Sequence, residues 1–145
     1  MSERVVVHMN SDFGTYFTVS DPDSEPDREP RDVSALHQLT PYGMLLASLG
    51  TCTAMVVHTY ARNRDLPLDE VELILEFGRA FDDDCENCEH IDHYDEVIRE
   101  EIRLQGNLSA EQRDKLFQIS HQCPINKMLQ AGTKIDSRLL DTPRA

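Results

Sequence analysis

One stretch decides the fold of this chain: residues 40–55, TPYGMLLASLGTCTAM. Thr40 offers a side-chain oxygen for a helix N-cap, and Pro41 follows at the first helical position, where its missing N–H costs nothing. The sequence therefore predicts a helix that begins here and runs to about Arg64. Its first half is apolar on nearly all sides, which is typical of a helix buried in the middle of a fold.

Short runs of β-branched and aromatic residues predict strands on both sides of this helix. Residues 5–9 and 16–19 predict a hairpin, because a segment rich in turn-forming residues separates them. The proline-rich and charged residues 20–32 predict a loop. The remaining predicted strands are residues 33–39, 70–77, 97–104 (with a helix as the alternative) and 134–140.

Two shorter helices are predicted near the end of the chain. Ser109 and Gln112 form a capping box, which predicts a helix that ends near His121. A second short helix is predicted from Cys123 to Gly132. Hairpins and helices are separated along the chain, so the fold class predicted is α+β rather than a parallel doubly wound sheet.

Composition limits the partners and the location. The 145 residues are expected to form one domain, residues 1–145, and they carry a formal net charge of −13. Nucleic acids and anionic membranes attract basic surfaces, so we expect neither as a partner. Residues 1–7 lack the apolar stretch of a signal peptide, and polar residues interrupt the apolar region 41–60. We therefore expect a cytoplasmic protein, whose four cysteines are reactive or metal-binding rather than structural disulfides.

Two cysteines occupy positions where sulfur chemistry is plausible. Cys52 lies in the middle of the predicted long helix, where it is either a small buried apolar residue or a nucleophile. Cys123 is the predicted N-cap of a helix that opens with Pro124, and free N–H groups there favour a thiolate. His121 and Lys127 are close enough in sequence to add positive charge. The alternative for Cys123 is that its sulfur only caps the helix.

A polar insertion at residues 81–95 contains a second group of possible ligands: Cys85, Cys88, His90 and His93. Two cysteines and two histidines could complete a tetrahedral zinc site. Finger-type sites, however, separate their two halves by about a dozen residues, and here one residue does so. We therefore expect an inert acidic loop with no bound metal or cofactor, and the alternatives are a zinc site or a redox-active cysteine pair.

The stretch 40–55, combined with the later Cys123-Pro124-Ile125-Asn126-Lys127, resembles the OsmC/Ohr family of osmotically inducible and organic hydroperoxide resistance proteins. The resemblance covers about residues 30–140, and the Cys85–Cys88 insertion resembles a loop of one branch of the family. It implies an intertwined homodimer in which curved antiparallel sheets wrap on two long central helices. The sites would lie at the dimer interface.

The same resemblance implies a thiol-dependent peroxidase. Cys52 would be the peroxidatic cysteine, attacking an organic hydroperoxide to give an alcohol and a sulfenic acid. Cys123 would resolve the sulfenic acid by forming a disulfide, which an external dithiol then reduces. An apolar pocket lined by residues such as Leu45, Leu49 and Met55 would favour organic over hydrogen peroxide.

The chain departs from the family pattern at two supporting positions. Family peroxidases also use a glutamate at the start of the cysteine helix, where this chain has Tyr42 or Gly43, and an N-terminal arginine. Neither Arg28 nor Arg31 matches a motif, so no arginine is assigned. Without a positioned cation, we expect burial to raise the pKa of Cys52. The alternative function is a non-enzymatic scaffold that binds a small apolar ligand or a metal at the dimer interface.

Overall fold

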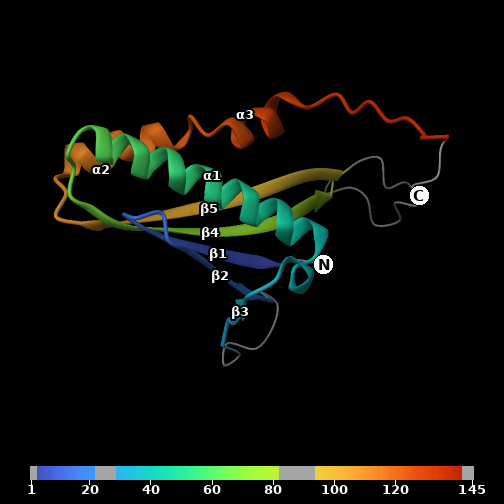
Figure 1. Ribbon diagram of the computed structural model, residues 1–145, viewed down its shortest axis with the longest axis horizontal. Coiled ribbons are helices and arrows are strands. Elements are labelled where there is room, and N and C mark those ends of the chain that lie inside the picture. Colours follow the sequence, from blue (N-terminus) through green and yellow to red (C-terminus); the bar gives the residue numbers. More distant parts are fainter. Residues whose placement is uncertain (1–2, 22–28, 82–93, 142–145) are drawn as a thin grey trace.

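A five-stranded antiparallel sheet carries the helices on one of its faces (Figure 1). The computed structural model describes residues 3–21, 29–81 and 94–141. The sheet order is β3-β2-β1-β4-β5, and this arrangement confirms the α+β class. In chain order the elements are β1 (Arg4–Asn10), β2 (Thr15–Ser20), β3 (Arg31–Val33), the 3-10 helix η1 (Leu36–Gln38), α1 (Pro41–Asn63), β4 (Leu68–Phe81), β5 (Tyr94–Gly106), α2 (Ala110–Ser120) and α3 (Pro124–Ala131).

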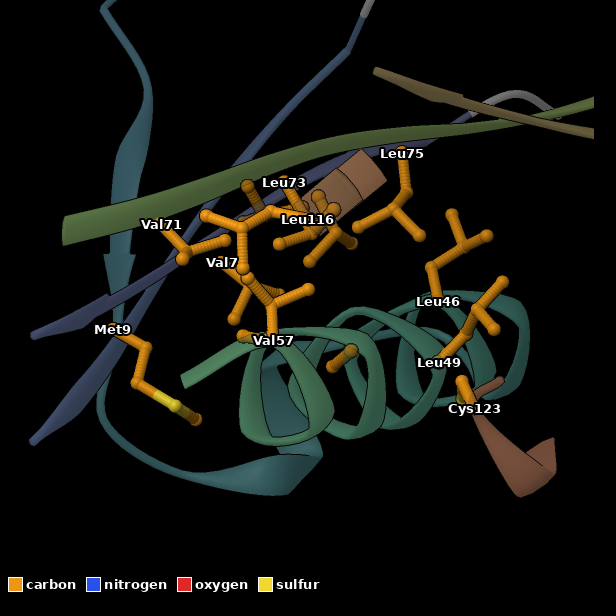
Figure 2. Packing of buried hydrophobic residues seen from close by; sticks show 14 of the residues in the cluster. Val7, Met9, Leu46, Leu49, Val57, Val71, Leu73, Leu75, Leu116 and Cys123 are labelled. Carbon is orange, nitrogen blue, oxygen red and sulfur yellow. The ribbon is translucent and has the colours of Figure 1, made fainter. Parts of the chain in front are cut away.

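The hydrophobic core lies between the sheet and α1, as Figure 2 shows. Alternate residues of β1 are buried, because successive side chains of a strand point to opposite faces. Val7 stands opposite Leu73 of β4 on one side and Phe17 of β2 on the other, so the buried rows of the strands are in register. The fully buried side chains include Val5, Val7, Leu46, Val57, Val71, Leu73, Leu75, Leu116 and Cys123.

The long helix α1 begins where the sequence predicts. The Thr40 hydroxyl oxygen accepts the backbone N–H of Gly43 at 3.0 Å, and Pro41 occupies the first helical position. The helix extends over 23 residues to Asn63, next to the predicted end at Arg64. The two capping predictions near the C-terminus are also confirmed, because α2 opens with the Ser109 capping box and α3 has Cys123 as its N-cap.

Burial of α1 is confined to one side of the helix, which corrects the expectation of burial all round. Its buried residues are Gly43, Leu46, Ala47, Leu49, Gly50, Thr53, Ala54, Val57, His58 and Ala61. The opposite side is also apolar, but Met44 and Met55 on it are exposed. Among the described residues, α1 is the one helix long and apolar enough to cross a membrane, a property shared by core helices of soluble proteins. The sheet that covers its buried side accounts for that apolar character.

Two predicted strands differ in the structure. Strand β3 covers Arg31–Val33 and gives way to η1, because the Gln38 side chain accepts the backbone N–H groups of Ser34 and Ala35 and closes a turn. Residues 133–140 form no strand but leave α3 as irregular chain, in which Ile135 is 84% and Leu139 89% exposed. A strand needs a neighbour to pair with, and this segment runs away from the sheet (Figure 1).

His58 joins the end of α1 to the sheet. Its side chain is 3% exposed, and Nε2–H donates to the Met9 carbonyl oxygen of β1 at 2.9 Å. Burial lowers the pKa of His58, the hydrogen bond to Met9 opposes this effect, and the nearby charge of Arg62 adds to it. The folded protein therefore holds this imidazole in its neutral form more firmly than the unfolded chain does.

We expect the free energy of unfolding to decrease as the pH falls below about 6.5, the ordinary histidine pKa, because the unfolded chain then binds a proton before the folded protein does. Urea unfolding between pH 5 and 8 measures this slope. His58→Gln should flatten it, whereas His37→Gln, a change at an exposed histidine, should leave it unchanged. Equal slopes in the wild type and His58→Gln would contradict the assignment.

Gly50 allows α1 to approach the sheet closely. A Cβ at this position would lie 2.7 Å from side-chain carbons of Leu75 on β4 and Val7 on β1. Both neighbours are fully buried, so neither can move without disturbing the core. Gly50→Ala should therefore destabilise the protein by about 1–3 kcal/mol, as overpacking of a core usually does. The urea midpoint tests this, with Thr59→Ala on the exposed side of α1 as the control; an unchanged midpoint for Gly50→Ala would refute it.

Candidate functional site

Cys52 lies on α1 at the wall of a large apolar groove. The groove has a volume of about 810 Å³, and its wall residues carry no charge. All three α-helices contribute to its wall, for example Met55 of α1, Ile119 of α2 and Ile125 of α3. The complete lining is Phe17, Leu36, Met44, Ala47, Ser48, Thr51, Cys52, Met55, Val56, Thr59, Tyr60, Asn63, Ile119, Gln122, Pro124 and Ile125. Such a groove suits an apolar molecule better than a charged one.

The groove partly corrects the predicted pocket. Met55 lines it, as predicted, whereas Leu45 and Leu49 do not. Leu49 is buried and borders a smaller cavity of about 400 Å³ on another side of the helix. Residues at spacings of three and four share one helix face only broadly, so Leu49 and Cys52 reach different surroundings.

Cys123 lies directly behind Cys52. It is fully buried at the N-cap of α3, where its sulfur accepts the backbone N–H of Asn126 at 3.4 Å. The Cys123 side chain is near enough to Cys52 to raise the pKa of the Cys52 thiol. Both cysteines are free thiols. The structure thus brings together the two cysteines that the sequence singled out, with Cys52 open to the groove and Cys123 closed off from solvent.

The surroundings of Cys52 favour its thiol form. Burial is the largest effect and raises the pKa of Cys52, and the hydrogen bond with Cys123 raises it further. The backbone N–H of Ile125 hydrogen-bonds the sulfur and acts in the opposite direction. The negative charge of Glu100 adds a smaller upward effect. The expected rise in the pKa therefore agrees with the structure, and at neutral pH the thiolate is the minor form.

The hydrogen bonds of His121 and Lys127 go to groups other than the Cys123 sulfur. His121 Nδ1 is hydrogen-bonded to the Phe117 carbonyl oxygen at 2.9 Å. Lys127 Nζ donates to the Gln122 side chain at 2.8 Å. The Cys123 sulfur accepts a hydrogen bond from the backbone N–H of Asn126 in α3.

Glu100 affects the pKa of Cys52 and was not predicted as a site residue from the sequence. The half-buried positions of β5 alternate as Ile98, Glu100, Ile102 and Leu104, so a carboxyl group occupies an apolar row. Its Oε1 atom is shielded from solvent and has no hydrogen-bond partner within the described part of the chain. Burial raises the pKa of Glu100, while a hydrogen bond from Thr53 and the charge of His121 lower it. A glutamate at an apolar strand position was the sequence signal for it.

A carboxylate also lies at the start of α1, although it does not come from the helix itself. The Glu3 carboxylate accepts the Thr40 hydroxyl at 2.5 Å, and a Cβ at Gly43 would overlap it. The sequence predicted no carboxylate there, because the helix itself has Tyr42 and Gly43 at its start. Glu3 reaches this place from the residue before β1.

The other residues considered from the sequence are exposed or lie outside the described residues. Arg31 is exposed at the start of β3, and Arg28 lies outside the described residues. The possible ligands Cys85, Cys88, His90 and His93 also lie outside them. In the part of the chain that the structure describes, no three His, Cys, Asp or Glu side chains gather in a way that could hold a metal ion.

Alkylation tests the state of Cys52. In a Cys85→Ser/Cys88→Ser background, we expect iodoacetamide to modify Cys52 half-maximally at a pH above about 8.5, the ordinary cysteine pKa. Cys123→Ala removes one of the groups that raise the pKa of Cys52 and should shift the profile to lower pH. A wild-type profile centred at or below neutral pH would contradict the geometry described here.

Comparison with known proteins identifies the family. The family model for OsmC-like proteins matches residues 34–138, most of the chain. The crystal structure of an OsmC-like hydroperoxide resistance protein from Jannaschia sp. CCS1 is similar at 16% identity, with a TM-score of 0.61 over 97% of this chain and 96% of that one. An OsmC-like protein from Mycoplasma pneumoniae gives a TM-score of 0.46 at 14% identity over 86% of this chain and 85% of that one. No curated protein sequence matches the chain significantly. Because the family model covers well over half of its residues, the chain belongs to the OsmC-like protein family.

Proposed function

We propose that this protein is a thiol-dependent peroxidase that reduces organic hydroperoxides through Cys52 and Cys123. One observation carries the proposal: Cys52 opens to a large uncharged groove while the buried Cys123 is near enough to raise the pKa of its thiol. The groove offers an apolar organic peroxide a place beside the first sulfur. The second sulfur is near enough to act on the pKa of the first, which makes the two cysteines candidates for a disulfide.

The two sulfurs have different roles in this reaction. The Cys52 thiolate attacks the distal oxygen of ROOH, an S–O bond forms, the O–O bond breaks and the alkoxide leaves as ROH after protonation. Cys123 then attacks the Cys52 sulfur, so that an S–S bond forms and the S–OH group leaves as water. An external dithiol reduces the disulfide by exchange and restores both thiols. No cofactor is needed for these steps.

Backbone N–H groups and apolar side chains around the two sulfurs have separate roles in this reaction. The N–H of Ile125 stabilises the Cys52 thiolate, since it is the interaction that lowers the pKa. The N–H of Asn126 does the same for the Cys123 sulfur when it becomes the nucleophile. Met55 and Ile119 present apolar surface to the organic group of the peroxide.

We also infer that the working form is a homodimer. Large apolar side chains remain exposed on η1 and on α1, where Leu36, Met44 and Met55 line the groove, and in the C-terminal segment, at Ile135, Leu139 and Leu140. Contiguous exposed apolar surface is typical of an interaction site. A second copy covering the groove would pair two α1 helices at the centre and shield both sulfur pairs from water. A cytoplasmic location and a dithiol partner complete the proposal, because both keep the cysteines reduced.

The alternative is a non-enzymatic scaffold that holds a small apolar ligand in the groove. Two observations favour it: the groove wall carries no charge, and the pKa of Cys52 is raised rather than lowered. A slow thiol in an apolar cavity can be a passive part of a binding site. The two functions differ in whether peroxide is consumed.

The deciding experiment adds cumene hydroperoxide to the reduced protein and follows peroxide loss and disulfide formation by mass spectrometry. We expect a Cys52–Cys123 disulfide, no turnover in Cys52→Ser, and a sulfenic acid that dimedone traps in Cys123→Ser. Cys85→Ser/Cys88→Ser is the control and should retain turnover. Consumption no faster than that of a free thiol, together with a retained ligand in native mass spectrometry, would favour the scaffold instead.

A further inference from the structure

We propose that the Ser48 hydroxyl is the hydrogen-bond donor for the peroxide: it stabilises the negative charge that forms on the leaving oxygen when the Cys52 sulfur attacks. This role rests on the proposed function, because it concerns the same sulfur and the same groove. It gives α1 two groups that act on one substrate, a nucleophile and, one helical turn before it, a donor.

Cleavage of the O–O bond requires a partner for the leaving oxygen. The thiolate attacks the distal oxygen of ROOH, and the other oxygen departs as an alkoxide, which is a strongly basic anion. In a groove whose wall residues carry no charge, such an anion is costly unless a positioned donor meets it. The described wall residues offer uncharged side-chain donors: Ser48, Thr51, Thr59, Tyr60, Asn63 and Gln122.

Ser48 is the donor that the helix places next to Cys52. The two residues are four positions apart on α1, so their Cβ atoms lie about 5–6 Å apart on one side of the helix. Side chains of an α-helix lean toward its N-terminus, so the Cys52 side chain leans toward the turn that carries Ser48. Both residues line the same groove. A peroxide that binds against the sulfur in this groove therefore also meets the Ser48 hydroxyl.

The Ser48 hydroxyl is available to a substrate. Ser48 is exposed, and within the described part of the chain its Oγ atom takes part in no hydrogen bond. By contrast, Thr53 on the buried side of the same helix donates its hydroxyl to the Leu49 carbonyl oxygen at 3.0 Å. Ser48 is also not among the groups that shift the pKa of Cys52, so the resting sulfur does not hold its hydroxyl.

The other donors on α1 are less well placed. Thr51 directly precedes Cys52, and adjacent residues of a helix do not face each other. Thr59 follows Cys52 by seven residues, which is about 10 Å along the helix axis. Tyr60 and Asn63 are farther along still. Among the donors on this helix, Ser48 is therefore the one that shares both the level and the side of the sulfur.

Gln122 is the competing donor, because it reaches the groove from the connection between α2 and α3. It directly precedes Cys123 in the chain. Its side-chain oxygen accepts Lys127 Nζ at 2.8 Å, which ties the amide group to α3. This hydrogen bond makes Gln122 less free than Ser48 to follow a substrate, and a Gln122→Leu variant tests the difference.

The reaction step balances with the donor in place. The Cys52 thiolate forms an S–O bond with the distal oxygen as the O–O bond breaks, which leaves Cys52–SOH and RO⁻. The sulfur is oxidised and the peroxide is reduced. The alkoxide accepts a hydrogen bond from the Ser48 hydroxyl, which keeps its own proton. The alkoxide then takes a proton from water in the open groove and leaves as ROH.

Oxidants with different leaving groups test this role. Cumene hydroperoxide releases an alkoxide, which needs a donor, whereas perbenzoic acid releases benzoate, an anion that is stable without one. Mass spectrometry of quenched samples gives the rate at which each oxidant modifies Cys52 in the reduced protein, in the Cys85→Ser/Cys88→Ser background. Ser48→Ala removes the donor, Ser48→Thr keeps a hydroxyl, and Thr59→Ala removes another hydroxyl from the same groove. Ser48→Ala should fold normally, because the site is exposed and alanine favours a helix.

Ser48→Ala should slow oxidation by cumene hydroperoxide and leave oxidation by perbenzoic acid unchanged. We expect a loss of at least about 10-fold with cumene hydroperoxide, since removal of one preorganised oxyanion donor costs on the order of 10²–10³-fold and Ser48 is partly open to water. The iodoacetamide profile of Cys52 against pH should not move, because the thiolate itself is unaffected. Ser48→Thr should recover most of the rate, and Thr59→Ala should keep the wild-type ratio of the two rates.

The outcomes separate this inference from the proposed function. Ser48→Ala that is slowed equally with both oxidants, or with neither, would overturn the donor role. Slowing confined to Gln122→Leu would also overturn it and assign the donor to the connection between α2 and α3. A fast wild type with an equally fast Ser48→Ala refutes the role of Ser48 alone and leaves the peroxidase intact. A wild type that reacts with cumene hydroperoxide no faster than a free thiol refutes both.

Discussion

The packing of α1 on the sheet is the constraint on which the rest of the structure depends. Gly50 lets the helix approach Val7 and Leu75 so closely that no further carbon fits between them. This close approach fixes the height and rotation of the helix, and with them the direction in which Cys52 points. Since α2 and α3 also pack against α1, the position of Cys123 relative to Cys52 depends on the position of α1 on the sheet. The sulfur pair is therefore positioned by core packing rather than by a loop.

The same packing creates a conflict for a nucleophilic cysteine. Burial excludes water from the sulfur and makes room for an apolar substrate, but it also raises the pKa of Cys52 and reduces the share of thiolate. The described residues of the groove wall supply no cation to offset this effect. The backbone N–H of Ile125, at the start of α3, is the compensation that the structure does provide.

Local features of the fold were predictable from the sequence, and long-range ones were not. Thr40 with Pro41 and Ser109 with Gln112 fix helix starts through contacts within a few residues, so those starts were predicted correctly. Residues 134–140 have strand propensity, but a strand also requires a partner edge, which propensity does not supply. The cysteine pair was predicted through resemblance, whereas the carboxylate of Glu3 beside Gly43 depends on a meeting between β1 and α1 that no local pattern reveals.

Glu100 has one feature that the sequence shows and another that only the structure shows. Its place in the row of Ile98, Ile102 and Leu104 is visible in the sequence once the strand and its inward face are known. What the sequence lacks is the identity of the neighbours across that face, namely Thr53 on α1 and Asn126 on α3. A polar residue in an apolar strand row costs stability wherever it occurs, but only the packing of the layer above it tells whether that cost serves chemistry. Here that layer includes Asn126, which lines the same cavity as Glu100 and whose backbone N–H donates to the Cys123 sulfur.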